Sequence, residues 1–238
     1  MGNEPRFWAV IPAAGSGVRM GGAIPKQYLT LAGRTVIEHV LDCFLSHARI
    51  TGITVAVASN DPYWQRYLLR SQSKPVCIAE GGQERAHSVL NALHSLREEL
   101  KRGDWVLVHD AVRPCLHHDD INRLIRTLAH DSVGGILAMP LTDTVKRVDE
   151  DRVIRETMDR QQLWRAFTPQ MFRYGLLTAA LETALNSGHV PTDEAATMEI
   201  AGYAVRVVPG RSDNLKITCG EDMGLAEAIL KQRGDRHT

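Results

Sequence analysis

The sequence predicts an α/β fold built on a mostly parallel β-sheet. The first observation is that short, almost continuously apolar runs alternate with longer amphipathic segments between residues 7 and 140. Strands covered on both faces of a sheet have this apolar character, and alternation with helices indicates parallel crossovers. The second observation is a break in the alternation at Leu141, where a polar segment typical of a β-hairpin begins. For 238 residues we expect one domain spanning 1–238.

The elements of the predicted sheet can be named in chain order. Five apolar runs are predicted as strands: Phe7–Ile11, Ile53–Ala58, Val76–Ala79, Trp105–His109 and Gly135–Met139. Four amphipathic segments between them are predicted as helices: Val36–His47, Tyr63–Leu69, Arg85–Leu100 and Ile121–His130. In the third helix Val89, Leu93 and Leu96 keep a helical spacing, which indicates one apolar face.

The segment Asp143–Thr157 alternates apolar and polar residues on both sides of an acidic turn at 149–151. This period of two predicts a hairpin. Because a polar two-stranded hairpin is not stable alone in water, it is either a solvated surface feature or an arm that packs on a partner subunit. Three later helices and one more strand are predicted at Met171–Leu185, Asp193–Ile200, Asp222–Lys231 and, for the strand, Ala204–Val208.

The composition argues against several classes of protein. Hydrophobic residues make up 44% and charged residues 24% of the chain, and the formal net charge is zero. This balance is typical of a globular protein and gives no support for a general nucleic-acid or membrane-surface binder. No apolar run approaches the roughly 20 residues needed to cross a bilayer, and we find no signal-peptide pattern. The four cysteines form no C-x-x-C pair, so we expect free thiols and a cytoplasmic location.

Residues 13–28, AAGSGVRMGGAIPKQY, form a glycine-rich loop after the first predicted strand. An ATPase-type phosphate loop requires G-x-x-x-x-G-K-[ST], but Ala23 and Ile24 stand at the last two positions. A dinucleotide-binding loop requires G-x-G-x-x-G opening a helix. Here Met20 replaces the third glycine, and Pro25 disfavours helical dihedrals before it. The ATPase-type phosphate loop is therefore excluded, and the dinucleotide-binding loop has weak support.

The loop that remains carries two cations, Arg19 and Lys26. Gly15 and Gly17 allow the backbone to approach an anion closely, and exposed N–H groups can form a nest around it. Two cations near a phosphate chain suit phosphoryl or nucleotidyl transfer, where catalysis is mainly positioning and charge stabilisation. The alternative interpretation is a surface loop with incidental charges.

Seven motifs follow one another along the chain: PAAGSGVRMGGAIPKQY, GGQERAHSVLNAL, HDAVRP, DTVKR, TMDRQQLWRAFTPQ, TDEA and DNLKIT. Together they resemble the signature of the 2-C-methyl-D-erythritol 4-phosphate cytidylyltransferases, a family of the nucleotide-diphospho-sugar transferase superfamily. The resemblance covers nearly the whole chain. It implies a Rossmann-like, mostly parallel sheet flanked by helices, with a projecting β-hairpin arm.

The resemblance also implies an activity. CTP and 2-C-methyl-D-erythritol 4-phosphate would give 4-diphosphocytidyl-2-C-methyl-D-erythritol and pyrophosphate in the non-mevalonate isoprenoid pathway, with Mg²⁺ or another divalent cation. The substrate phosphate would attack the α-phosphorus of CTP in line, so no protein nucleophile is required. The family's homodimer implies that residues 141–160 form an arm that helps to complete the partner's substrate site. Neither a nucleic acid nor a membrane is implied as a partner.

Individual residues receive roles from the same resemblance. The catalytic cations would be Arg19, Lys26 and Lys216. The residues that bind CTP would be Pro12, Ala13, Ala14, Gly15, Ser16, Gly17, Gly81, Gly82, Arg85, Ser88 and Asp110. The residues that bind the polyol phosphate would be Arg113, Thr144, Arg160, Thr168, Thr192 and Asp193. Asp110 would hold the metal ion or, alternatively, the ribose.

Several of these roles have alternatives. Of Arg85 and Ser88, one would orient the glycine pair at 81–82 and the other would bond the base. Arg113 would either structure its own loop or contact the substrate, and Asp193 would either accept from a substrate hydroxyl or begin a helix. For the whole chain, the first rival is a cytidylyltransferase that acts on ribitol 5-phosphate. The second is a CTP-binding module without catalysis, although a mere binder has little need for three cations at the transferred phosphate.

Overall fold

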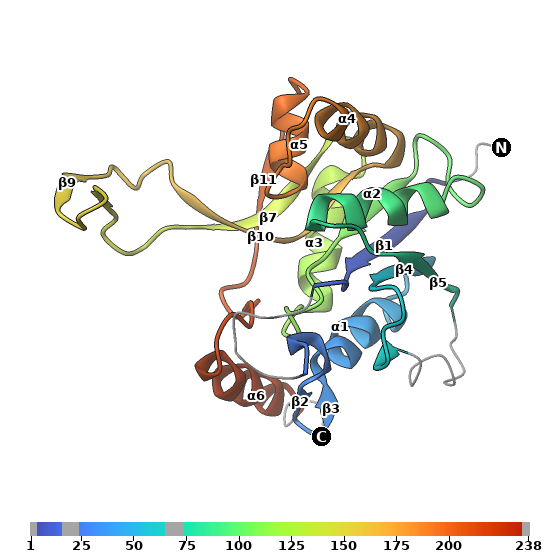
Figure 1. The fold of residues 1–238 in the computed structure, drawn as a ribbon, viewed down its shortest axis with the longest axis horizontal. Coiled ribbons are helices and arrows are strands. Elements are labelled where there is room, and N and C mark those ends of the chain that lie inside the picture. The colour runs from blue at the N-terminus through green and yellow to red at the C-terminus, as the bar shows by residue number, and fades with distance from the viewer. Residues whose placement is uncertain (1–3, 16–23, 65–73, 235–238) are drawn as a thin grey trace.

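A seven-stranded sheet runs through the middle of the computed structural model, which describes residues 4–15, 24–64 and 74–234 (Figure 1). Its strand order is β11-β7-β10-β6-β1-β4-β5. Only β10 among these strands is antiparallel to its neighbours, so the predicted α/β fold with a mostly parallel sheet is confirmed. The strands are β1 (Phe7–Pro12), β4 (Gly52–Val57), β5 (Val76–Glu80), β6 (Trp105–Val108), β7 (Gly134–Pro140), β10 (Trp164–Arg173) and β11 (Arg206–Pro209).

Helices cover both faces of this sheet. Alternate side chains of β1 point to opposite faces, because successive residues of a strand do so. Phe7 and Ile11 join a core with α1 and α3, whereas Trp8 and Val10 join a second core with α2, α4 and α5. Strands buried on both sides read as continuous apolar runs, which explains why they were visible in the sequence. The helices are α1 (Val36–Leu45), α2 (Arg85–Ser95), α3 (His118–Leu128), α4 (Tyr174–Asn186), α5 (Glu194–Ile200) and α6 (Glu221–Gly234).

A third, smaller core fixes the C-terminal helix. Leu31 of the two-residue strand β2 (Thr30–Leu31) packs there with Ala226 of α6 and with Ile217. Ile217 also donates its backbone N–H to the carbonyl of Val112, 2.9 Å away. The partner of β2 is β3 (Arg34–Thr35), and the 3₁₀ turn η2 (Lys26–Tyr28) precedes this pair. This core therefore holds the segment before α6 close to the glycine-rich loop.

The prediction of a helix from Met171 to Leu185 was wrong at its start. Residues 171–173 belong to β10, which was not predicted at all, and α4 begins only at Tyr174. Pro169 hid the strand, because proline cannot donate to a ladder and normally excludes a central strand. In the structure, Pro169 lies where the register of β10 against β7 shifts, between Ala166 and Gln170. The ladder therefore needs no N–H from it.

The predicted hairpin is confirmed, and it projects far from the body of the molecule (Figure 1). Its strands are β8 (Lys146–Val148) and β9 (Ile154–Thr157), which form a separate two-stranded sheet. The apolar side chains of Val148, Val153 and Ile154 are about half exposed, at 48%, 51% and 59%. A hairpin that buries so little of its apolar surface in its own subunit is stabilised poorly by that subunit.

The remaining expectations agree with the structure within a few residues, with two exceptions. The helix expected at Arg85–Leu100 ends at Ser95, although Leu96 and Leu100 are still buried after it. Most of the helix expected at Tyr63–Leu69 lies outside the described residues. Each helix in the described part of the chain is too short or too polar to cross a lipid bilayer.

Gly52 provides a test of the packing around β1. A Cβ at this position would lie 2.4 Å from the ring of Trp8, which is 2% exposed. We expect Gly52→Ala to lower the free energy of unfolding by about 1–3 kcal/mol, the usual cost of overpacking a core. Urea unfolding followed by circular dichroism measures this. Gly103→Ala is the control, since a Cβ there meets nothing within 4 Å and should change stability by less than about 0.5 kcal/mol. Equal stability of the two variants would contradict the prediction.

Candidate functional site

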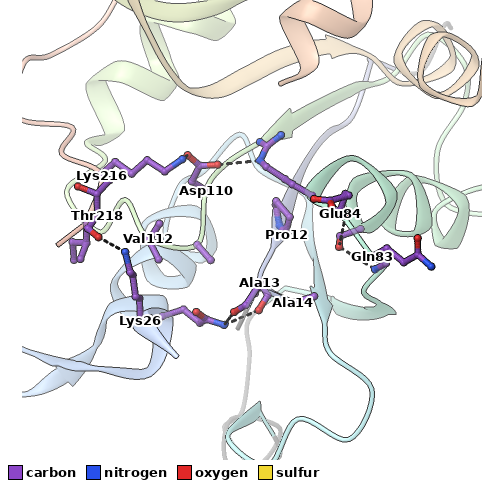
Figure 2. A pocket seen from close by; sticks show the side chains of 17 residues that line it. Pro12, Ala13, Ala14, Lys26, Gln83, Glu84, Asp110, Val112, Lys216 and Thr218 are labelled. Carbon is purple, nitrogen blue, oxygen red and sulfur yellow. Dashed lines mark hydrogen bonds and ion pairs between the residues drawn. The ribbon is translucent and has the colours of Figure 1, made fainter. Parts of the chain in front are cut away.

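A cleft of about 600 Å³ lies at the carboxyl-terminal edge of the parallel strands. It is lined by residues 12–15 at the end of β1, residues 82–85 and Ser88 after β5, residues 110–112 after β6, the start of η2 and residues 216–218. Open α/β sheets bind ligands at this edge. The cleft thus brings together parts of four of the seven motifs that are far apart in the sequence (Figure 2).

The beginning of the glycine-rich loop is held by Gln27. Its buried amide Nε2 donates to the carbonyls of Ala13 and Gly15, at 2.7 and 3.1 Å. Gln27 was not among the predicted site residues, because glutamine carries no distinctive signal and its contacts depend on the turn at η2. A Cβ on Gly15 would meet nothing within 4 Å, so the backbone there is open toward the cleft. Ser16, Gly17 and Arg19 lie outside the described residues.

The glycine pair at 81–82 is required by close packing within the protein. A Cβ on Gly81 would lie 2.1 Å from the Cβ of Ala14, and one on Gly82 would lie 2.3 Å from the Cβ of His87. Ser88 fixes the same loop, since its hydroxyl accepts from the N–H of Gly82 at 3.0 Å and donates to the carbonyl of Glu84. Of the two residues considered for orienting this loop, the structure therefore gives that contact to Ser88.

Asp110 is the centre of charge in the cleft. Its Oδ1 lies 3.2 Å from Nε of Arg85, and its Oδ2 lies 3.3 Å from Nε of Arg113 and 3.0 Å from Nζ of Lys216. Burial by itself raises the pKa of this carboxyl group, but Arg85, Lys216 and Arg113 outweigh burial and hold the pKa well below its ordinary value. Asp110 is therefore an anion at neutral pH.

Arg85 is held from two sides. Its terminal nitrogens donate to both carboxylate oxygens of Glu194, at 2.6 and 3.1 Å, while Nε faces Asp110. Burial disfavours the charged guanidinium, but Glu194 and Asp110 together raise its pKa above the ordinary value. Glu194 was not among the predicted site residues either. Its partner is 109 positions away, and nothing local marks the pair.

The two predicted catalytic lysines, Lys26 and Lys216, both belong to the described residues and lie on one side of the cleft (Figure 2). Lys216 points toward Asp110, and Lys26 donates to the backbone carbonyl of Thr218. Thr218 is fixed in turn by Asp222, which accepts from its N–H and its hydroxyl at 2.7 Å each. These bonds, led by the hydroxyl, lower the pKa of Asp222 to about 2. Each ammonium has three donors, so both lysines retain donors for a phosphate.

Buried residues contact Asp110 and the loop that carries it. The hydroxyl of Thr168 accepts from the N–H of Asp110 at 3.1 Å and contacts Nδ1 of His109 at 3.0 Å. Burial lowers the pKa of His109 to about 4, so this ring is neutral at pH 7. Arg113 is also buried, and it donates to the carbonyl of Asn214 at 2.8 Å. The structure therefore gives Thr168 and Arg113, both predicted to bind substrate, contacts that organise the loop of Asp110.

The other predicted substrate residues lie elsewhere. Thr144 and Arg160 flank the hairpin of β8 and β9, are exposed, and are not among the residues that line the cleft. Thr192 is exposed at the start of α5. Asp193 is the N-cap of α5, accepting from the N–H of Ala196 at 2.8 Å, and its other oxygen accepts from Gln170 at 2.9 Å. Of the two roles considered for Asp193, the start of a helix is therefore confirmed. Its contact with a substrate stays a prediction.

No group of three or more His, Cys, Asp or Glu side chains within the described ranges is arranged to hold a metal ion. Asp110 is the buried carboxylate that lines the cleft. Three of the about four lone-pair positions on its oxygens face cations of the protein. One position is left, which fits Mg²⁺ because this ion binds through one or two carboxylates with phosphates and waters as the other ligands.

Comparisons with known proteins agree with this geometry. The sequence model of the 2-C-methyl-D-erythritol 4-phosphate cytidylyltransferase family matches residues 7–232. The enzyme of that name from Pseudomonas aeruginosa strain PAO1 is 56% identical over 92% of this chain and 94% of its own length. The one from Pseudomonas putida strain F1 is 52% identical over 92% and 93%.

Solved structures show the same likeness. A crystal structure of 4-diphosphocytidyl-2C-methyl-D-erythritol synthase is 35% identical, with a TM-score of 0.82 over 95% of this chain and 99% of that chain. The cytidylyltransferase of Francisella tularensis is 35% identical, with a TM-score of 0.81 over 94% and 99%. Sequence, fold and the arrangement of charges in the cleft lead to the same conclusion: the chain belongs to the 2-C-methyl-D-erythritol 4-phosphate cytidylyltransferase family.

Proposed function

We propose that this protein transfers the cytidylyl group of CTP to the phosphate of 2-C-methyl-D-erythritol 4-phosphate, in the non-mevalonate isoprenoid pathway. The products are 4-diphosphocytidyl-2-C-methyl-D-erythritol and pyrophosphate. The observation that carries the proposal is the cleft at the sheet edge, in which Lys26 and Lys216 stand beside an open glycine backbone. Membership of the family supplies the identity of the two substrates.

The cleft is suited to stabilising charge, and no nucleophile is paired with a base among its described lining residues. Among the described residues that line it there is no His, Cys or Tyr, and the hydroxyls of Ser88 and Thr218 are engaged within the protein. Asp110 has a depressed pKa and is a poor base. In-line attack by a phosphate oxygen needs neither a protein nucleophile nor a strong base, and positioned cations provide most of the catalysis.

Within that reaction Lys26 and Lys216, together with Arg19 by resemblance, stabilise the negative charge that grows on the α-phosphate. The loop at 81–82 and the strand end at residues 12–15 hold the base, ribose and triphosphate. Asp110 would hold Mg²⁺ with oxygens of the triphosphate and waters. A bound Mg²⁺ would neutralise charge on the pyrophosphate that leaves.

The polyol phosphate is bound, in this proposal, by Thr144 and Arg160 of a partner subunit's arm. Arg160 is exposed and does not line the cleft of its own chain, and the arm exposes Val148, Val153 and Ile154. Both features are expected of an arm that packs on a second copy in a two-fold homodimer. We also propose a cytoplasmic location, which is consistent with four free cysteines.

The first prediction from this proposal concerns the substrate. With CTP, Mg²⁺ and 2-C-methyl-D-erythritol 4-phosphate, the protein should release pyrophosphate at a rate that exceeds the rate with ribitol 5-phosphate by about a hundredfold or more, because polar groups left unpaired by the wrong polyol cost affinity. A coupled pyrophosphate assay measures both rates. Faster release with ribitol 5-phosphate would favour the sister activity. No release with either would leave a CTP-binding module.

The second prediction concerns Lys26. Lys26→Ala should lower kcat on the order of 10²- to 10³-fold, as removal of one donor to a developing anion does. The KM for CTP should change only a few-fold, because the interaction strengthens in the transition state. Steady-state kinetics measure the split, and Lys231→Ala on the exposed face of α6 is the matched control. Equal losses in kcat and in CTP affinity would contradict the role given to Lys26.

The third prediction concerns the arm. Arg160→Ala and Lys26→Ala homodimers should each have little activity. An equal mixture of the two variants, unfolded and refolded together, should regain roughly a quarter of the wild-type rate, because about half of the dimers are then mixed and one of the two sites in each mixed dimer is intact. Pyrophosphate release measures the recovery. If mixing restores nothing, Arg160 serves the cleft of its own subunit.

A further inference from the structure

Glu194 is a buried carboxylate that does not line the cleft. It is the first residue of α5, and it is 2% exposed. Both of its oxygens accept from Arg85, at 2.6 and 3.1 Å. Two parallel bonds of this kind fix the plane of a guanidinium as well as its position.

Arg85 connects Glu194 to the charged residues of the cleft. Its Nε donates to Oδ1 of Asp110 at 3.2 Å, and Oδ2 of the same carboxylate lies 3.0 Å from Nζ of Lys216. Opposite charges therefore alternate along a chain from Glu194 through Arg85 and Asp110 to Lys216. Arg85, Asp110 and Lys216 line the cleft, and Glu194 supports them from outside.

We propose that Glu194 is a positioning residue for cytidylyl transfer, which acts through Arg85 to hold Asp110 and Lys216 in place at the CTP side of the cleft. The inference rests on the proposed function. Glu194 belongs to the TDEA motif, but the motif by itself gives this residue no partner and no role.

The charges explain why a carboxylate is needed at this position. The cluster contains three cations, Arg85, Arg113 and Lys216, and two carboxylates, Asp110 and Glu194. Without the charge of Glu194, Arg85 would have Asp110 as its only anionic partner. The guanidinium would then compete with Lys216 for Asp110, or turn toward an incoming triphosphate, which attracts guanidinium strongly.

The neighbouring residue Asp193 is held independently of this chain of charges. It caps α5 through the N–H of Ala196 and accepts from Gln170, whose own oxygen accepts from the N–H of Ala195 at 2.8 Å. Loss of the charge on Glu194 should therefore disturb the CTP side and leave the start of α5 in place. This separates a positioning role from a general role in folding.

The first experiment is Glu194→Gln, which keeps the shape and one acceptor but removes the charge. We expect kcat to fall on the order of ten- to a hundredfold, since small displacements of catalytic groups cost this much. The KM for 2-C-methyl-D-erythritol 4-phosphate should stay within about twofold. Glu182→Gln on α4 removes the carboxylate of an exposed pair with His94 of α2. It is the matched control and is expected to leave kcat unchanged.

The second experiment is a double-mutant cycle with Arg85→Met. If Glu194 acts through Arg85, Glu194→Gln should cause no further loss of kcat in the Arg85→Met background. It should also raise the melting temperature of that background, because the unpaired buried carboxylate is neutralised. The double variant contains neither buried charge, so it keeps the test valid if a single variant folds poorly.

The outcomes distinguish the two proposals. A wild-type protein that releases no pyrophosphate from CTP overturns the proposed function itself. An active wild type with an unchanged kcat in Glu194→Gln overturns only the positioning role. Additive losses of kcat in the cycle, or a loss confined to the KM of the polyol phosphate, overturn it as well.

Discussion

The cleft depends on one buried carboxylate, Asp110, and on the need to neutralise it. An isolated ionised carboxylate inside a protein is strongly disfavoured unless it is paired and hydrogen-bonded. Asp110 meets this need by drawing cations from three separate parts of the chain: Arg85 from α2, Arg113 from its own loop and Lys216 from the segment before α6. The same contacts that stabilise the charge therefore assemble three walls of the cleft, and Asp110 cannot lose its charge without weakening all of them.

The sheet decides where this carboxylate stands. β6 ends at Val108, so Asp110 is delivered to the carboxyl edge next to the end of β1, where parallel strands leave room for a ligand. The antiparallel strand β10 then adds what a purely parallel sheet would lack. Its Thr168 receives the N–H of Asp110, and its Gln170 holds Asp193 and the N–H of Ala195 at the start of α5. One irregular strand thus supports two sides of the site.

A feature of the fold or of the site could be predicted from the sequence when the residues that form it are close together along the chain. Buried strands, the hairpin and the cations of the glycine-rich loop have local signals. These are apolar runs for the strands, alternation for the hairpin and, for a cation such as Lys26, a glycine-rich stretch that includes Gly15. β10 was missed because Pro169 is a local signal against a strand, and only the register shift against β7 makes it harmless. Gln27 and Glu194 were missed because their roles come from partners that folding brings to them. Arg85 and Glu194 are 109 residues apart, and the sequence around each of them does not show that they form a pair.

The arm and the Asp110 cluster are connected through the same strand. β10 begins at Trp164, four positions after Arg160, and continues without interruption in the chain to Thr168 beneath Asp110. The arm exposes apolar side chains that its own subunit does not cover, as expected if it packs on a second subunit as proposed. Ordering of the arm would also restrain the beginning of β10, since the two are joined by backbone and by the ladder to β7. In the proposed function, the half of the cleft that holds CTP is built within one chain. The half proposed to depend on the arm is joined to it through β10, and this continuity gives a physical reason for the proposed substrate contacts on a hairpin that leads directly into the central sheet.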